Sequence, residues 1–186
     1  MTSKNSSAWK NAALIGAVAT SLAACGTMMS GSPTMASPIT PDAVKVPAGN
    51  KVAMVLVGEG MLTYECRANA AGAPTPFGWS PPAPDAVLKE KSGAIVGKYY
   101  PGPTWEHNDG SKITGKQLAV SPATTGIAMQ LVQANPATGT GAMMNVTYIQ
   151  RLNTVGGTPA GTCDATNVGA KQVVKYAADY YFYKPS

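Results

Sequence analysis

The densest group of titratable side chains lies around the single histidine of the sequence, where Glu106, His107 and Asp109 occur together. Hydrolysis of a glycosidic bond needs a carboxyl group held out of water with a raised pKa, and Glu106 or Asp109 could supply it. Neighbouring strand residues point to opposite faces, so Glu106 and His107 share a pocket only if a bulge intervenes. Asp109 also precedes Gly110, a pair typical of turns. A solvated hairpin tip is the preferred interpretation, and a carbohydrate-directed envelope hydrolase using Glu106 or Asp109 is the alternative.

Aromatic residues near this cluster favour binding over catalysis. Planar rings stack on sugar faces and on partner side chains, and the polar tips of Tyr and Trp orient the contact. Burial in a core is the competing interpretation, and it is the commoner one for Trp105. Tyr180 and Tyr181 cannot both point inward if they lie in a strand, so some tyrosine surface is expected outside. The candidate binding surface comprises Trp79, Tyr99, Tyr100, Trp105, Glu106 and Asp109.

Charged residues and glycine motifs add little chemistry. Glu65, Arg67, Arg151 and Asp179 could clamp a ligand, although paired charges on a strand surface are commoner. Gly58-Glu59-Gly60 lacks the third glycine and the following helix of a dinucleotide fingerprint, and the sequence has no Walker A or His-Glu-x-x-His motif. We therefore expect no cofactor. The sequence favours a non-catalytic binding or structural domain over an enzyme.

The cysteines indicate an oxidising compartment. If Cys25 carries lipid, as argued below, Cys66 and Cys163 remain, and an even number outside the cytoplasm predicts a disulfide. Tetrahedral zinc sites need three or four Cys or His ligands, and the chain has one histidine and no second cysteine pair. We expect a Cys66–Cys163 bond and no metal.

The N-terminus resembles a bacterial lipoprotein signal. Lys4 and Lys10 precede an apolar run over residues 12–24, whose 13 residues would span about 20 Å as a helix, too short for a hydrocarbon core of about 30 Å. The run ends in Leu22-Ala23-Ala24-Cys25-Gly26, which resembles a lipobox. An ordinary secretory signal followed by a chance cysteine is the alternative. We predict a cleaved signal peptide (1–24), a lipidated Cys25 that binds the membrane, and a Pro-rich tether (25–45). Gly26 rather than Asp after the cysteine indicates the outer membrane.

Composition limits the class of the remaining domain (46–186). Without Lys4 and Lys10, 12 basic and 9 acidic residues leave a net charge of +3, too weak for a nucleic-acid-binding surface. Only 12% of residues are charged, while 20 Gly and 15 Pro favour a turn-rich β fold over a helical bundle.

Short apolar or alternating segments predict an all-β domain, an antiparallel sandwich or barrel of about nine strands. A turn is expected at residues 58–60, an irregular Pro-rich loop at 69–84, and a two-residue hairpin at Asp109-Gly110. Pro101 and Pro103 lack backbone donors, so the bend between them should form the rim of any functional surface. Residues 127–134 could be a strand or a short helix. The predicted strands are 51–57, 61–66, 86–89, 94–100, 104–108, 111–119, 127–134, 143–152 and 172–183.

Several stretches in order resemble the domain-of-unknown-function 3455 family, secreted proteins of bacteria and fungi. The resemblance covers residues 46–183. It implies no activity and no site residues. The expected function is an envelope lipoprotein presenting an aromatic surface to a glycan or an envelope protein. The stretches are Val46-Pro47-Ala48-Gly49, Gly102-Pro103-Thr104-Trp105-Glu106, Asp109-Gly110-Ser111, Tyr148-Ile149-Gln150-Arg151-Leu152-Asn153-Thr154-Val155-Gly156-Gly157, Cys163-Asp164 and Tyr176-Ala177-Ala178-Asp179-Tyr180-Tyr181-Phe182-Tyr183.

Overall fold

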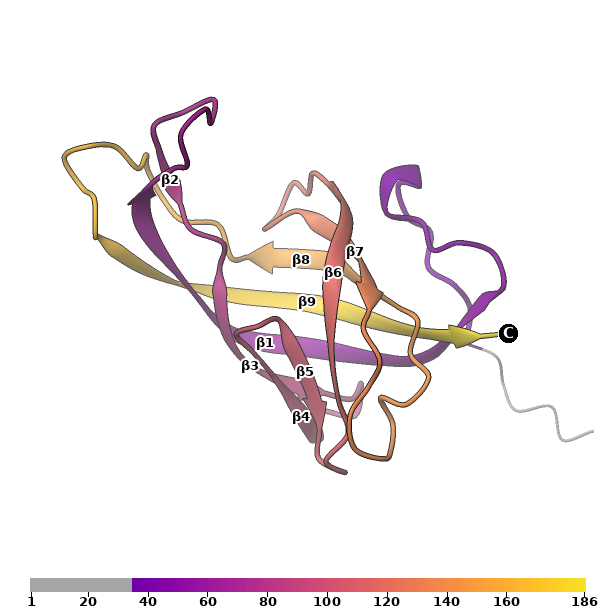
Figure 1. Cartoon of the computed structure of the whole chain (residues 1–186). Helices are drawn as coiled ribbons and strands as arrows, with labels where there is room; N and C mark the ends of the chain where they lie inside the picture. Colours follow the sequence, from indigo (N-terminus) through magenta and orange to yellow (C-terminus); the bar gives the residue numbers. More distant parts are fainter. Residues whose placement is uncertain (1–34) are drawn as a thin grey trace, which may run out of the picture. The chain divides into compact units, whose positions relative to one another are not determined.

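A computed structural model describes residues 35–186 of the chain (Figure 1). The predicted signal peptide, Cys25 and the first part of the predicted tether lie outside the described residues. No helix within residues 35–186 is long and apolar enough to cross a membrane.

The described residues form an all-β domain, as predicted, with one short 3-10 turn, η1 (Asp42–Val44). The strands are β1 (Asn50–Ala68), β2 (Phe77–Trp79), β3 (Ala83–Lys89), β4 (Ile95–Tyr100), β5 (Thr104–His107), β6 (Lys112–Ser121), β7 (Met129–Ala134), β8 (Tyr148–Gly156) and β9 (Lys171–Pro185).

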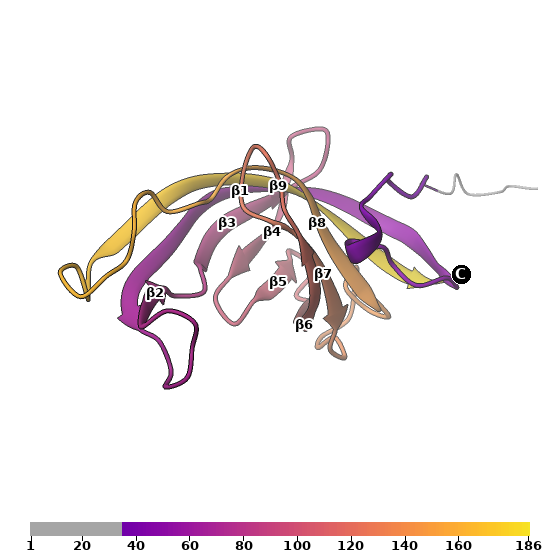
Figure 2. The same cartoon turned by 90° about the horizontal axis from the view of Figure 1, so that it is seen from above.

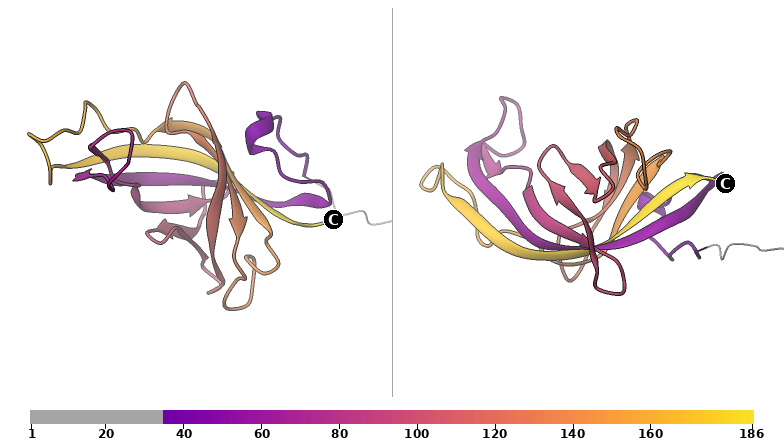
Figure 3. Two further views of the ribbon diagram at one scale, coloured as in Figure 1. Left: turned by 45° about the horizontal axis from the view of Figure 1, so that its top comes forward. Right: turned by 90° about the horizontal axis from the view of Figure 1, so that it is seen from below.

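The sheet closes on itself. Each strand from β3 to β9 pairs antiparallel with the next, and β1 pairs with β3 on one side and with β9 on the other. Eight strands therefore form a barrel, the second of the two predicted architectures. The short β2 pairs only with the end of β1, from Cys66 to Ala68. Figures 2 and 3 show β1 and β9 lying side by side and arching together around the other strands.

The predicted turn at residues 58–60 is wrong, because β1 runs through it without interruption. At Gly58 and Gly60, the position that a side chain would occupy faces the barrel interior. A Cβ atom at Gly58 would lie 2.7 Å from Cε2 of Tyr180, and one at Gly60 would lie 2.1 Å from the carbonyl oxygen of Asp85. The two glycines therefore allow close packing where the long strand bends. A local sequence pattern cannot distinguish a glycine needed for such packing from a glycine in a turn.

Other boundaries also differ from the expectation. The β5–β6 hairpin exists, but its loop has three residues with Gly110 at φ 87°, since His107 donates to Ser111 O. Residues 127–134 contain strand β7 rather than a helix. The strand predicted from residue 143 begins only at Tyr148. The expected loop at 69–84 contains β2 and the start of β3.

An aromatic cluster fills one part of the barrel interior. Trp105 stacks on Tyr99 with ring centroids 4.8 Å apart, and its edge meets Tyr180 at 5.7 Å. Trp105 is 1% exposed, which confirms its prediction as a core residue. The hydrogen bond expected for its indole N–H is absent, because Nε1 has no partner among the described residues.

A second apolar cluster lies on the outside of the barrel. Val44 of η1 is fully buried there against Leu131 and Leu152, and the side chain of Gln150 donates to the carbonyl oxygen of Val44. The packed part of the chain thus begins before the expected domain boundary at residue 46. As a consequence, both faces of β8 are buried.

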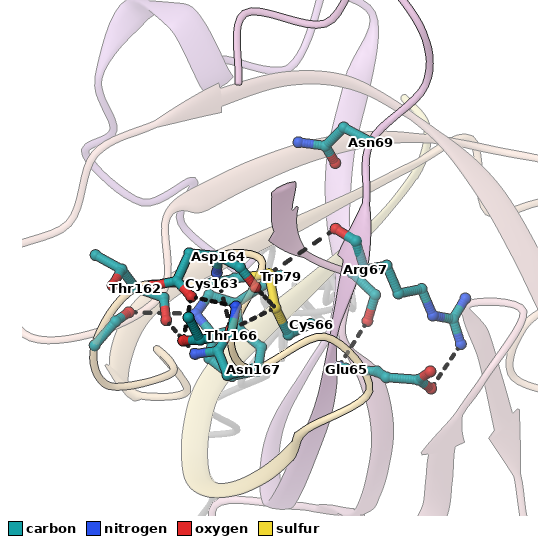
Figure 4. The surroundings of a disulfide bond; sticks show 12 residues. Glu65, Cys66, Arg67, Asn69, Trp79, Thr162, Cys163, Asp164, Thr166 and Asn167 are labelled. Atoms are coloured by element: carbon teal, nitrogen blue, oxygen red, sulfur yellow. Dashed lines mark hydrogen bonds and ion pairs between the residues drawn. A yellow bond between two sulfur atoms is a disulfide. The ribbon is translucent and has the colours of Figure 1, made fainter. Parts of the chain in front are cut away.

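The predicted disulfide joins Cys66 at the end of β1 to Cys163 in the β8–β9 loop, and Figure 4 shows its surroundings. Backbone hydrogen bonds on both sides of Cys66 reach Gly169 and Ala170, so this loop is held against the end of β1. Asp164 and Asn167 shape the loop through hydrogen bonds to one another and to their neighbours.

Reduction of this bond should lower the melting temperature. The cysteines are 97 residues apart, and cross-linking such a loop stabilises the fold by about 4.7 kcal/mol in the chain-entropy model. For a domain of this size we expect a fall of roughly 10 °C. Thermal melts with and without reductant measure it. Alkylation of both Cys66 and Cys163 in native, unreduced protein, read by peptide mass spectrometry, would contradict the prediction.

Trp105→Ala should cost about 3–5 kcal/mol of unfolding free energy, because it removes the largest fully buried side chain of residues 35–186. Trp105→Phe keeps a ring on Tyr99 and removes the unpaired N–H, so its loss should be smaller. Urea melts of both variants measure the difference. A Trp105→Ala variant as stable as the wild type would show that the aromatic cluster does not support the barrel.

Candidate functional site

A cavity of about 890 Å³ lies at the end of the barrel where β1 finishes and β9 begins. Inward-facing residues of β1, β4, β6, β7 and β8 line it, and the β4–β5 turn at Pro101, Gly102 and Pro103 forms part of its rim. Small eight-stranded barrels have interiors wide enough to hold one small ligand.

Strand alternation brings the lining side chains together. Arg151 on β8 lies opposite Tyr180 on β9 and opposite Gln130 on β7, so all three face inward. Tyr99 on β4 belongs to the same inner face, because it pairs with Trp105. The cavity keeps its width partly because Gly115 on β6 has no side chain: a Cβ there would lie 2.4 Å from Cγ1 of Val132.

Arg151 is the charged residue inside the cavity, and its side chain is only 6% exposed. Its Nε and Nη2 atoms donate to the carbonyl oxygen of Ala128 at 3.2 and 2.9 Å. Within residues 35–186 no Asp or Glu oxygen lies within 4.0 Å of its guanidinium nitrogens. The buried cation is therefore held by a neutral acceptor.

Four tyrosine side chains are close enough to this cation to feel its charge. Tyr64 donates to the carbonyl oxygen of Gly157, and the hydroxyl groups of Tyr176 and Tyr180 bond to each other. Burial raises the pKa of Tyr64, Tyr99, Tyr176 and Tyr180, and the positive charge of Arg151 offsets only part of that rise. The phenols stay neutral at physiological pH, so they do not balance the charge of Arg151.

The rim of the cavity is more polar than its interior. Arg67 pairs with Glu65 at 2.8 Å, and both side chains are partly exposed. The Glu65 carboxylate accepts a hydrogen bond from Arg67, and this bond lowers its pKa. Lys171 lies opposite Glu65 on β9. Farther round the rim, Gln130 donates to the side-chain oxygen of Gln117.

The predicted binding surface does not form one patch, because only Tyr99 of its six residues lines the cavity. Trp105 is in the core. Tyr100 and Glu106 lie on the outside of the barrel, where the Tyr100 hydroxyl donates to Glu106 Oε2 at 2.6 Å. This bond, together with Lys98, lowers the pKa of Glu106.

The other two members, Asp109 and Trp79, lie at the β5–β6 turn and on β2. Asp109 at the β5–β6 turn accepts hydrogen bonds from the Ser111 hydroxyl and from the backbone of Ala142 and Ser111, which hold its pKa well below the usual range. Its carboxylate also lies 2.9 Å from Nδ1 of His107. Trp79 on β2 donates from its indole to the carbonyl oxygen of Gly161 in the β8–β9 loop.

The environments of Glu106 and Asp109 differ from the environment that a general acid needs. Such a role needs a raised pKa, whereas the pKa values of Glu106 and Asp109 are lowered, and neither residue lines the cavity. Residues 35–186 also contain no group of three His, Cys, Asp or Glu side chains arranged to hold a metal ion.

Sequence reasoning named Arg151 only as one member of a four-residue clamp. The structure brings three of the four, Glu65, Arg67 and Arg151, to the same cavity, and Asp179 is not among its lining residues. Glu65 and Arg67 pair at the rim, and Asp179 accepts a hydrogen bond from Asn153 at 2.8 Å. Tyr64 and Gln130 were not singled out. The available signal was the alternation in β8, which puts Arg151 on the same face as the apolar Ile149.

Comparison with known proteins gives a family. A family model described as a protein of unknown function (DUF3455) matches residues 86–184, which is 99 of the 186 residues. No curated protein and no solved structure matches the chain significantly. Because the match covers more than half of the chain and overlaps the region of predicted resemblance, the chain belongs to the domain-of-unknown-function 3455 family.

Proposed function

We propose that this protein binds a small organic molecule in the cavity of its barrel and is held at the bacterial cell envelope by lipid on Cys25. The observation that carries the binding function is the cavity of about 890 Å³ at the barrel end. Sites for small molecules are concave and mostly apolar, with a few polar groups that fix orientation. Tyr99, Ile127 and Val132 supply the apolar wall, and Arg151 and Gln130 supply polar groups.

The cavity supports binding better than an outer aromatic surface does. Every Phe, Tyr and Trp within residues 35–186 is buried or half-buried, and the exposed large hydrophobic residues in that range are aliphatic or Met. A flat platform for stacking on a glycan or an envelope protein would need exposed rings. The ligand therefore binds inside the barrel. Glycoside hydrolases use two carboxyl groups, and Glu65 is the only carboxylate among the described residues that line the cavity, which does not favour the hydrolase alternative.

The proposed location rests on two observations. The Cys66–Cys163 bond fits an oxidising compartment. The lipobox-like Leu22-Ala23-Ala24-Cys25-Gly26 supports lipidation, and Gly26 supports the outer membrane. A folded domain on a short Pro-containing segment would stay close to the bilayer while its cavity samples the surrounding solution.

A neutral fluorescent probe, N-phenyl-1-naphthylamine, should bind saturably to the wild type, because its apolar rings match the cavity wall. Gln117→Trp puts a large side chain at the cavity lining and should weaken binding at least about tenfold, a difference of about 1.4 kcal/mol. Calorimetry and fluorescence titration measure both affinities.

Leu118→Trp is the matched control. Leu118 is the next residue of β6, is 47% exposed and does not line the cavity. It should leave the affinity unchanged. Absence of saturable binding to the wild type, or an equal loss in both variants, would rule out the cavity as the binding site.

Cys25→Ser should abolish membrane attachment. Several acyl chains give stable anchoring, and the serine variant would lack the thioether and the processed N-terminus. In detergent phase partitioning we expect the wild type in the detergent phase and a clear shift of the variant away from it. A wild type that partitions into the aqueous phase would contradict lipidation.

A further inference from the structure

We infer that Arg151 binds the carboxylate of the ligand, and that the ligand is an organic monocarboxylate with an apolar body. This inference rests on the proposed function, since it assigns the ligand class of the same cavity. It starts from the one buried charge in the cavity that lacks an ionic partner among the described residues.

Burying an unpaired charge is expensive. Removing a charged group from water has a large free-energy cost even after the protein relaxes, and proteins normally compensate with a partner of opposite charge. Arg151 is 6% exposed and bonds only to the carbonyl oxygen of Ala128 among the described residues. A neutral carbonyl recovers part of that cost and leaves the charge unbalanced.

The carboxylate on the neighbouring strand β9 and the one at the rim already have other partners. Asp179 lies opposite Leu152, and is thus on the outer face of the sheet, where Asn153 donates to it. Glu65 is paired with Arg67 at the rim. The surrounding tyrosines remain protonated, as described above. The missing negative charge is therefore expected from a bound molecule.

The donor geometry favours a carboxylate. A guanidinium group has five N–H donors in a planar fork, and the bonds to Ala128 occupy two of them. The remaining donors can meet the two oxygens of a carboxylate in parallel hydrogen bonds. A single buried cation balances one negative charge, so a phosphate dianion would leave an excess charge in the same interior.

The apolar body follows from the other walls. Tyr99, Ile127 and Val132 contact the same cavity as Arg151, and a ring or chain attached to the carboxylate would cover them. Gln117 and Gln130, which bond to each other, line the same cavity and could contact a polar substituent of the ligand. The rim cations Arg67 and Lys171 would favour entry of an anion.

Three probes with the same ring system test this assignment: 2-naphthoate, the neutral 2-naphthamide and 2-naphthyl phosphate. Calorimetry should show that the wild-type full chain binds 2-naphthoate at least about tenfold more tightly than the amide, the difference expected of a charge-assisted hydrogen bond. The phosphate should bind more weakly than the carboxylate. Arg151→Met should bring the naphthoate and naphthamide affinities to within about twofold, while keeping the volume of the side chain.

Lys116→Met is the matched control, because it removes an exposed cation that does not line the cavity and should keep the preference for the carboxylate. Melting temperatures check that each variant is folded. Since Arg151→Met removes an unbalanced buried charge, the empty variant should melt at or above the wild-type temperature. A purely structural Arg151 would instead give a destabilised variant that still prefers the carboxylate.

The assignment is overturned if the wild type does not discriminate between naphthoate and naphthamide, if Arg151→Met keeps the preference, or if the phosphate binds most tightly. These failures are distinct from failure of the proposed function. If N-phenyl-1-naphthylamine binds the cavity but naphthoate shows no preference, the binding function stands and the role of Arg151 falls.

Discussion

The pairing of β1 with β9 closes the sheet, and the rest of the structure depends on it. The register runs from Asn50 opposite Pro185 to Glu65 opposite Lys171, so the two ends of the domain hold each other. The bend of these long strands requires Gly58 and Gly60, where Tyr180 and the β3 backbone leave no room for a side chain. Without closure, the inner faces of eight strands would be exposed to water, and Arg151 would be an ordinary surface cation.

Closure divides the interior into a packed part and an open part, and Tyr99 lies at their boundary. One side of Tyr99 is stacked by Trp105, and the residue also lines the cavity. The aromatic cluster therefore fixes one wall of the cavity. At the same end of the barrel, the disulfide holds the β8–β9 loop beside the lining residues Arg67 and Lys171. Rigid surroundings of this kind hold a binding residue in place before a ligand arrives, which reduces the entropy lost on binding.

Local patterns predicted much of this fold. The alternation of β9 predicts one face. Four of its residues, Tyr176, Ala178, Tyr180 and Phe182, are buried, and the fifth, Val174, is partly buried against the core. The disulfide and the β5–β6 hairpin followed from cysteine number and from Asp109-Gly110. Local patterns gave wrong predictions where the conformation of a residue depends on a residue far away in the sequence. Gly58 is adapted to Tyr180, more than a hundred residues away, and the segment before Tyr148 alternates in polarity although its backbone turns, with Asn145 at φ 61°.

The candidate site was the hardest feature to predict, because alternation defines two faces of β8 without saying which is inside. Ile149 and Arg151 form one face, and Gln150 and Leu152 form the other, yet all four are buried. The second face is covered by Val44, in a segment that composition assigned to a tether. With both faces of β8 mixed in polarity, an arginine in this strand is most simply interpreted as half of a surface ion pair. The closed barrel shows that Arg151 shares its inner face with Tyr180 and Gln130. It also shows that Glu65 of β1 lies at the rim and that Asp179 of β9 lies on the outer face of the sheet. A cation kept in such a place at a cost to stability is best explained by a negatively charged group that comes from outside the chain.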